Sequence, residues 1–172
     1  MPGARTSNGG RHTLLETGEV VLCAGSFVTP HLLQLSGIGP RADLERRGLP
    51  VVKDAPSVGA RFSDHPQVLL EWAPRQDLGE PTDDPGTLAD DRALDAWIAG
   101  HLGTAHRTCG TAPMGPADDP GTVVDQYGRV HGIAGLRVAD ASILPEAPLR
   151  GPAATAVLTG ELIARAMRHD LR

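Results

Sequence analysis

An apolar strand that runs directly into a glycine turn and a helix constrains the fold of this chain more than any other feature. Residues 20–24 read Val-Val-Leu-Cys-Ala and Gly25 follows them, while a Thr-Pro pair at 29–30 predicts the opening of a short helix. Gly37 and Pro40 predict the end of that helix and the start of the next one. A strand, a tight turn and a helix N-terminus in this order are typical of α/β proteins that present backbone N–H groups to a cofactor.

The remaining pattern predicts short strands and three further helices. We expect strands at 12–16, 19–23, 68–72 and 135–140, helices at 40–47, 91–100 and 153–168, and a polar loop at 74–90. In the last helix one apolar line is formed by Ala154, Leu158, Leu162 and Ala166. The predicted core comprises Val20–Cys23, Leu32, Leu33, Leu35, Leu136, Val138, Val157, Leu158 and Leu162.

Length and charge exclude several classes of protein. The 172 residues allow one ordinary domain, and a net charge of −5 leaves no electrostatic footprint for nucleic acid. No apolar stretch approaches the roughly 20 residues that span a bilayer, and the N-terminus lacks the apolar core of a signal peptide. The two cysteines lie far apart, and Cys23 is predicted to be a buried free thiol. We expect a cytoplasmic protein without a membrane span.

Two short patterns resemble binding motifs, but neither of them predicts a binding site. The stretch from Gly37 to Ala42 fits the G-x-G-x-x-G/A dinucleotide fingerprint, but it follows a helix instead of a strand, and Pro40 lacks an N–H. The pair His101 and His106 has a spacing of five and no nearby Cys or Glu at ligand spacing, so no metal site is predicted.

Four segments carry a family resemblance. They are 25–39, Gly-Ser-Phe-Val-Thr-Pro-His-Leu-Leu-Gln-Leu-Ser-Gly-Ile-Gly; 58–65, Val-Gly-Ala-Arg-Phe-Ser-Asp-His; 106–115, His-Arg-Thr-Cys-Gly-Thr-Ala-Pro-Met-Gly; and 123–145, from Val-Val-Asp through Leu-Arg-Val-Ala-Asp-Ala-Ser-Ile-Leu-Pro. Together these segments resemble the glucose-methanol-choline (GMC) family of flavoprotein oxidoreductases. The resemblance covers roughly residues 19–72 and 91–168 and fits the C-terminal portion of that family.

The resemblance implies an α/β fold that is the C-terminal part of an FAD-binding flavoprotein, with a reduced substrate-binding region. It divides the chain into a partial flavin-binding domain at 1–66, a truncated substrate-binding region at 67–104 and a C-terminal flavin-binding segment at 105–172. FAD is the implied cofactor. The implied cofactor-binding residues are Gly25, Ser26, Thr29, Pro30, Asp64, His65, Asp140, Ala141 and Gly151. A carboxylate at a strand end, as at Asp140, can face a ribityl chain or a pyrophosphate together with backbone N–H groups.

The implied catalytic residues are His106, Arg107 and Arg150. In this family an H-x-x-G-T segment supplies the histidine that takes the proton of the substrate hydroxyl, and a neutral imidazole suits that work. Anchoring on Gly110-Thr111 puts Arg107 in the base position and leaves His106 one residue away, so both assignments stay open. Gly151 stands where the family usually has His or Asn. Arg150 is the polar residue beside it, and its guanidinium cannot act as a base.

The resemblance therefore implies an FAD-dependent oxidoreductase that acts on the CH–OH group of a small alcohol, in a C-terminal or truncated form. The strand–GxGxxG–helix unit that holds the ADP half of FAD in this family has no counterpart in these 172 residues. One alternative is an inactive remnant, or a half-domain that binds a separate chain supplying the N-terminal FAD-binding (Rossmann) half. An unrelated α/β binding module is the remaining alternative.

Overall fold

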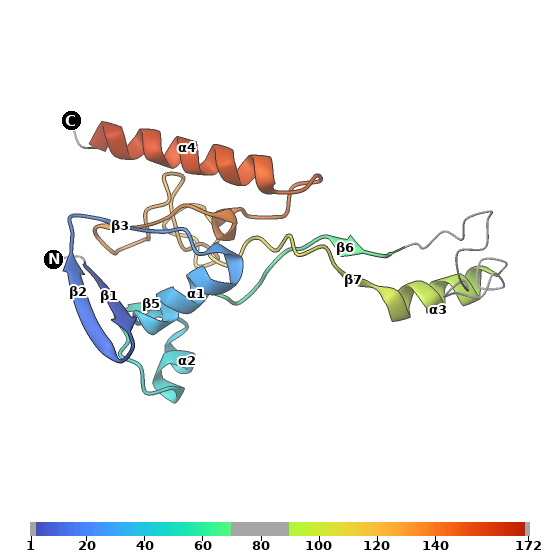
Figure 1. Ribbon diagram of the computed structural model, residues 1–172, viewed down its shortest axis with the longest axis horizontal. Coiled ribbons are helices and arrows are strands. Elements are labelled where there is room, and N and C mark those ends of the chain that lie inside the picture. Colours follow the sequence, from blue (N-terminus) through green and yellow to red (C-terminus); the bar gives the residue numbers. More distant parts are fainter. Residues whose placement is uncertain (1–2, 70–89, 171–172) are drawn as a thin grey trace. The chain divides into compact units, whose positions relative to one another are not determined.

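Strand β3 (Val20–Leu22) and strand β8 (Leu136–Val138) come from opposite ends of the sequence and form a parallel pair in the computed structural model (Figure 1). The structure describes residues 3–69 and 90–170. It divides the chain into two units: unit 1 is Met1–Ser63 with Arg107–Arg172, and unit 2 is Asp64–His106. The predicted strands at 19–23 and 135–140 are confirmed as β3 and β8. The three-part division of the sequence stays a prediction.

Helix α1 (Gly25–Leu35) follows β3 and begins earlier than the Thr-Pro pair predicts, so Pro30 lies inside it. The cause is a set of contacts upstream of Pro30. Gly25 adopts a left-handed φ of +80°, and its N–H donates to Oδ2 of Asp140 at 2.9 Å. The hydroxyl of Thr29 donates to the same oxygen at 2.6 Å. These bonds hold the first turn in place before the proline interrupts the helical hydrogen bonding.

The stretch from Gly37 to Ala42 confirms the interpretation as a helix end followed by a helix start. Strand β4 (Ile38–Gly39) leads into helix α2 (Arg41–Arg46) and returns in strand β5 (Lys53–Asp54), which pairs with β4 in parallel. Gly37 has a φ of +78°, and a Cβ placed on it would lie 2.4 Å from the carbonyl oxygen of Pro50. Only glycine fits this position without displacing the backbone.

The N-terminal strands β1 (Gly3–Asn8) and β2 (Arg11–Glu16) form an antiparallel hairpin. Its turn lies at Gly9-Gly10, where both glycines have positive φ. All six residues of β2 are exposed, including Leu14 and Leu15. The hairpin therefore contributes little to the core of unit 1.

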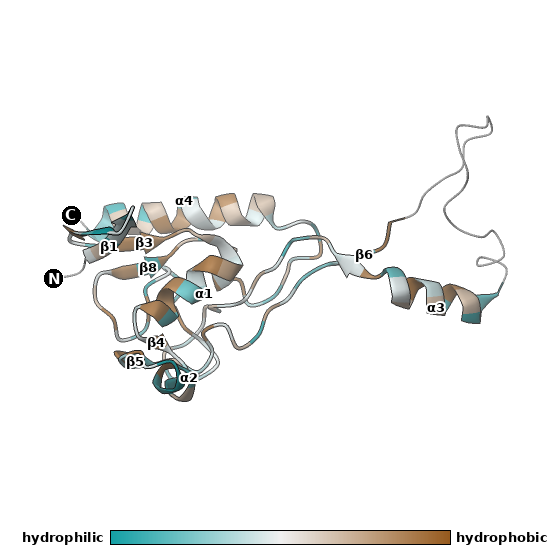
Figure 2. Ribbon diagram, turned by 60° about the horizontal axis from the view of Figure 1, so that its bottom comes forward, coloured by the Kyte–Doolittle hydropathy of each residue, from teal (hydrophilic) through white to brown (hydrophobic). Residues whose placement is uncertain are grey.

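The core of unit 1 lies around β8, β4 and the following loops, and Figure 2 shows the apolar colouring of α1 and β8. Of the predicted core residues, Leu33 and Val138 are fully buried, and Leu22 and Leu136 are partly buried. The predictions for Cys23, Leu35, Val157, Leu158 and Leu162 are wrong, because the structure exposes all five.

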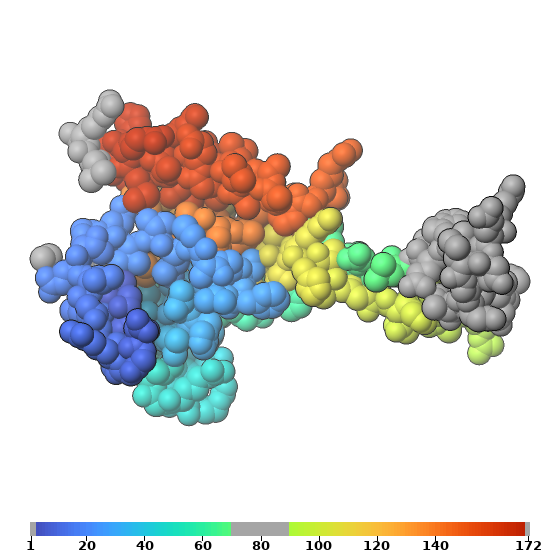
Figure 3. Space-filling view, in the orientation of Figure 1, coloured from blue at the N-terminus to red at the C-terminus, as the bar shows by residue number. Residues whose placement is uncertain are grey.

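Helix α4 (Ala153–Asp170) forms one side of unit 1 (Figure 3). It buries Ile163 and packs Met167 against the core. The face that turns inward is therefore the one next to the predicted face that contains Leu158 and Leu162. Hydrophobic periodicity found the helix but did not identify which apolar side turns inward.

Unit 2 contains helix α3 (Asp91–His101) and the antiparallel strands β6 (Pro66–Gln67) and β7 (Gly103–Thr104). The helix predicted at 91–100 is confirmed. Asp90 caps it, since its carboxylate accepts the N–H groups of Arg92 and Ala93. The polar loop predicted at 74–90 and most of the strand predicted at 68–72 lie outside the described residues. Within the described ranges, no helix combines the length and the apolar character needed to cross a membrane.

Candidate functional site

The carboxylate of Asp140 joins the turn after β3 to the turn after β8. Oδ2 accepts the N–H of Gly25 and the hydroxyl of Thr29, and Oδ1 accepts the N–H of Ser142 at 2.8 Å and the Ser142 hydroxyl. Asp140 precedes the 3₁₀ turn η2 (Ala141–Ile143) and caps it. Both oxygens are thus engaged by protein donors, so this carboxylate fixes the geometry of the two turns.

A third segment lies against the same two turns. The N–H of Gly110 donates to the carbonyl of Ala141 at 3.3 Å, and the N–H of Ala112 donates to the carbonyl of Ser142 at 2.8 Å. The hydroxyl of Ser26, in the first turn of α1, donates to the carbonyl of Thr108 at 2.7 Å. Three of the segments that carry the family resemblance, near residues 25, 110 and 140, therefore converge in unit 1.

The structure also brings Arg107 and Gly151 together. A Cβ placed on Gly151 would lie 3.3 Å from Cζ of Arg107 and 3.4 Å from its Nε. The absence of a side chain at 151 therefore makes room for the guanidinium of Arg107. Arg150 is exposed on the same loop. The two positions at which the sequence departs from the family pattern are thus spatial neighbours.

Asp64, His65 and His106 belong to unit 2, where Thr104 links them. The N–H of His65 and the hydroxyl of Thr104 both donate to the Asp64 carboxylate, and the N–H of His106 donates to Oγ1 of Thr104 at 2.9 Å. His106 has a φ of +55°, an uncommon conformation for a residue with a side chain. Such backbone strain persists only where surrounding contacts hold it, as the Thr104 bond does here.

The first turn of α1 offers backbone donors beyond the Gly25 N–H, which the Asp140 carboxylate already accepts. No side chain caps this helix, its first turn holds no acidic residue, and a Cβ on Gly25 would meet no atom within 4 Å. Uncapped N–H groups at a helix N-terminus suit phosphate oxygens and other polar acceptors. Together with the guanidinium of Arg107, this donor set fits the polar and anionic groups of FAD. Pro30 is buried behind it and Ala141 is partly buried.

Two polar groups beside this turn complete the picture. Cys23 is exposed at the surface, and partial desolvation of its thiol, followed by the charge of the Asp140 carboxylate, raises the pKa of that thiol. The hydroxyl of Thr111 is buried without a hydrogen-bond partner. In the part of the chain that the structure describes, no three His, Cys, Asp or Glu side chains are grouped as metal ligands.

The sequence reading missed Thr108 and Ser142 as partners of the site. Ser142 could have been found, because a Ser two residues after an Asp at a strand end commonly closes a local turn. Thr108 contributes only a carbonyl oxygen, and its partner Ser26 is 82 residues away in sequence. No residue type signals such a contact.

Known proteins resemble this chain in sequence, and the family that they indicate agrees with the geometry of the site. Two sequence models described as "GMC oxidoreductase" match the chain, one at residues 46–160 and the other at residues 3–67. A protein of Rhodococcus erythropolis described as a GMC-type oxidoreductase is 27% identical over 240 aligned positions, which cover 86% of this chain and 49% of that relative. Choline oxidase of Arthrobacter globiformis is 43% identical over 70 residues, which cover 41% of this chain and 13% of that enzyme.

Solved structures share the fold. An FAD-dependent oxidoreductase from Chaetomium thermophilum superimposes with a TM-score of 0.83 at 18% identity, covering 99% of this chain and 59% of that one. Formate oxidase from Aspergillus oryzae gives a TM-score of 0.78 at 19% identity, covering 99% of this chain and 58% of that one. The chain thus spans about half the length of these proteins.

Proposed function

The chain belongs to the GMC oxidoreductase family, and on that premise we propose that it forms the C-terminal part of an FAD-dependent oxidoreductase acting on the CH–OH group of a small alcohol. The convergence of three motif segments on the two turns that the Asp140 carboxylate joins carries this proposal. Those contacts give the first turn of α1 and the turn η2 one fixed arrangement. A preorganised arrangement of donors is what cofactor binding and hydride transfer need.

In this proposal the residues of unit 1 have distinct tasks toward FAD. The N–H groups at Ser26 and the uncapped turn beside Gly25 bind polar oxygens of the cofactor, while Thr29, Pro30 and Asp140 keep that turn in position. Ala141 and Gly151 are assigned to the same site by the family resemblance, Ala141 beside Gly110 and Gly151 beside Arg107. Bound FAD would supply the acceptor for the hydride that leaves the donor carbon. For Asp64 and His65, which belong to unit 2, a cofactor-binding role rests on the family resemblance alone.

The proposal keeps two assignments for the residue that acts on the substrate hydroxyl. His106 has an imidazole that can take the hydroxyl proton, whereas Arg107 and Arg150 can only hold a developing alkoxide by charge. The variants His106→Gln and Arg107→Met separate them in the flavin-loaded enzyme. If His106 is the base, His106→Gln removes the acidic limb of the pH–rate profile. If Arg107 holds the alkoxide, Arg107→Met lowers kcat at every pH and leaves the shape of the profile unchanged.

A half-domain that needs a separate FAD-binding chain is the second candidate. One observation favours it: α4 exposes Val157 by 75%, Leu158 by 57% and Leu162 by 54%. The parallel pair β3–β8 is a further sign, because parallel sheets in proteins are usually covered on both faces and contain more than two strands. In this candidate a chain carrying the strand–GxGxxG–helix unit completes the sheet. A cytoplasmic location is part of the proposal in both forms.

Titration with FAD tests the proposal and separates its forms. A purified chain that takes up FAD, with quenched flavin fluorescence and a characteristic absorbance, is expected for the enzyme. Uptake only after mixing with an N-terminal FAD-binding chain of the family indicates the half-domain. A chain that takes up no FAD in either mixture contradicts the oxidoreductase proposal and indicates a remnant. Asp140→Ala should abolish uptake and Asp54→Ala should not, because Asp54 is bound to Arg41 outside the site.

A further inference from the structure

A small pocket in unit 1 lies apart from the Asp140 site and has a composition of its own. Its volume is about 150 Å³. Its apolar floor and walls are formed by Ala55, Pro56, Ala117, Pro120, Val123 and Val130, and its polar rim by Lys53, Asp54, Thr122 and His131. Ala55, Val123 and Val130 belong to the buried core, so the floor is firmly packed.

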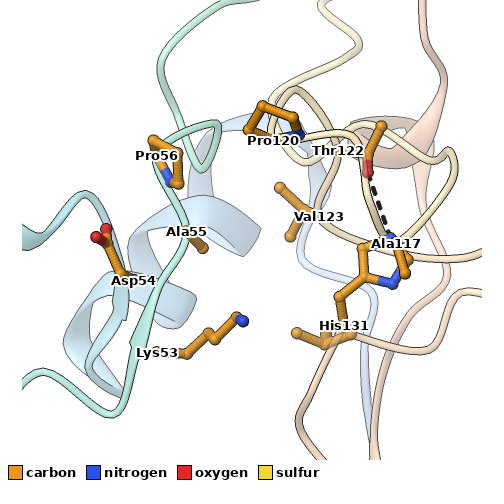
Figure 4. A pocket seen from close by; sticks show the side chains of 10 residues that line it. Lys53, Asp54, Ala55, Pro56, Ala117, Pro120, Thr122, Val123 and His131 are labelled. Carbon is orange, nitrogen blue, oxygen red and sulfur yellow. Dashed lines mark hydrogen bonds between the residues drawn. The ribbon is translucent and has the colours of Figure 1, made fainter.

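Lys53 provides the charge of this pocket. Lys53 and Asp54 are consecutive residues of β5, so their side chains point to opposite sides of the strand. Asp54 faces α2, where its carboxylate accepts the N–H of Arg41 at 3.1 Å and lies 3.7 Å from the Arg41 Nε. Figure 4 shows Asp54 directed away from the opening and Lys53 extending across it toward His131. The pocket therefore has a positive charge that its neighbouring carboxylate does not neutralise.

The Lys53 ammonium makes no ion pair or hydrogen bond with any residue in the described ranges 3–69 and 90–170. Its backbone is nevertheless fixed, because its N–H donates to the carbonyl of Gly37 at 3.0 Å. At the far wall, a Cβ placed on Gly132 would lie 3.5 Å from the Lys53 Nζ. A fixed strand thus delivers a compact ammonium, with three donors, to the side of the pocket opposite its stem.

His131 forms a fixed wall of the pocket. The Thr122 hydroxyl has one hydrogen, and its oxygen lies 2.7 Å from the carbonyl of Pro116, which accepts that hydrogen. The His131 Nε2, 3.4 Å from Thr122 Oγ1, is therefore the protonated nitrogen and donates to the hydroxyl oxygen. The N–H of His131 also donates to the carbonyl of Val123 at 3.0 Å. These bonds hold the imidazole ring in one orientation beside the opening.

We propose that this pocket binds a short-chain aliphatic carboxylate, with its carboxylate group on the Lys53 ammonium and its alkyl part against Ala55 and Val123. A volume of about 150 Å³ corresponds to about five water molecules at 30 Å³ each, which is the size of acetate or propionate and far below that of a nucleotide. The apolar floor favours a ligand with an alkyl part over inorganic phosphate or chloride. This site is independent of FAD and of the Asp140 site.

The sequence makes the proposal straightforward to test, because Lys53 is the only lysine among the 16 basic residues. Equilibrium dialysis with radiolabelled propionate on the full chain should give saturable binding with a Kd in the millimolar range. Lys53→Met should weaken binding about tenfold, as expected for loss of a charged hydrogen-bond donor. Lys53→Arg should retain part of the affinity. The matched control Arg165→Met removes one positive charge from the exposed face of α4 and should change nothing.

A second measurement places the ligand and does not depend on a variant that folds. Reductive methylation with labelled formaldehyde marks Lys53 and the N-terminal amine and keeps their charge. Propionate should shift the Lys53 methyl resonance with saturation, while the N-terminal resonance stays in place. A linear response would overturn the proposal. An equal response to chloride or phosphate, or equal weakening by Arg165→Met, would overturn it as well.

Discussion

Asp140 is the residue on which the geometry of the candidate site depends, because one carboxylate accepts donors from both turns. Asp140→Ala leaves the N–H of Gly25 and the hydroxyl of the fully buried Thr29 without their acceptor. Hydrogen bonds to a charged group contribute about 1.5–3 kcal/mol each and do not add fully. We expect the free energy of unfolding to fall by about 3 kcal/mol, measured by urea denaturation.

The companion variants define what this loss means. Thr29→Val keeps the shape of the side chain, removes the donor to Asp140 together with the acceptor of the Ala24 N–H, and should cost about 1–2 kcal/mol. Asp54→Ala removes an exposed carboxylate and should cost less than about 1 kcal/mol. Equal losses of unfolding free energy for Asp140→Ala and Asp54→Ala would show that the Asp140 hydrogen bonds stabilise the fold no more than an exposed carboxylate does.

Gly37 offers a second prediction at this scale, with Gly48 as its control. Both have positive φ, at +78° and +67°, but a Cβ on Gly48 would meet no atom within 4 Å. Gly48→Ala should therefore cost only the left-handed backbone penalty of about 1–2 kcal/mol. Gly37→Ala adds the collision with the Pro50 carbonyl and should lose at least about 3 kcal/mol of unfolding free energy. Similar melting temperatures for the two variants would contradict this account.

Ion pairs between side chains hold the C-terminal end of helix α4 in place. Arg137, which is 3% exposed, donates to Glu19 and Asp170, and Arg129 also donates to Asp170. These contacts connect α4 to β8 and to the residue before β3. Hydrogen bonds from Arg129, and then from Arg137, hold the pKa of Asp170 below its ordinary value. The last turn of the helix is therefore tied to the strands more firmly than its exposure suggests.

This network predicts a pH dependence. Because the pKa of Asp170 is lower in the folded chain, its contribution is fully present above the unfolded value of about 3.9 and is lost as the pH falls through the folded value. Asp170→Asn should speed amide hydrogen exchange in the last turns of α4 at pH 7. The difference from the parent chain should shrink below about pH 4. A difference that persists unchanged in acid would exclude the ion pairs as its cause.

Elements also show where sequence reasoning succeeds. Strands β2, β3 and β8 and helices α2, α3 and α4 could be predicted, because apolar periodicity and glycine punctuation act locally. The start of α1 could not, since a carboxylate 115 positions away from Gly25 determines it. The inward face of α4 could not either, because two neighbouring lines of the helix are apolar and only tertiary contact chooses Ile163.

For the site, the same distinction holds. Asp140, Ser26 and Gly110-Thr111 stand in recognisable motifs, so their segments were expected near one another. The resemblance pairs positions 107 and 151, but the direct contact between the Arg107 guanidinium and the Gly151 backbone depends on the loop after η2 and on the missing side chain at 151. Side-chain partners across 80 or more positions depend on the assembled fold, and a single sequence does not encode them in a readable pattern.

At the scale of the whole molecule, unit 1 has more apolar surface than its own core uses. Val157, Leu158 and Leu162 on α4 are all more than half exposed, and Phe27 on α1 is 71% exposed. Exposed large apolar side chains that gather on one helix face, as on α4, favour an interaction site. This surface agrees with a chain that spans about half the length of its relatives. We therefore relate the exposed apolar side chains of unit 1 to the proposal that a second chain completes the flavin site.

The double variant Leu158→Glu with Leu162→Glu tests this reading of α4. Their side chains are 57% and 54% exposed, so charge there should leave the melting temperature within a few degrees of the parent value. Association with an N-terminal FAD-binding chain, measured by sedimentation velocity, should decrease. Leu149→Glu is the matched control, because Leu149 is fully exposed on a loop, at 103%. Unfolding of the double variant would mean that this chain itself covers the face, and an equal effect of Leu149→Glu would mean that charge alone, not the α4 face, governs association.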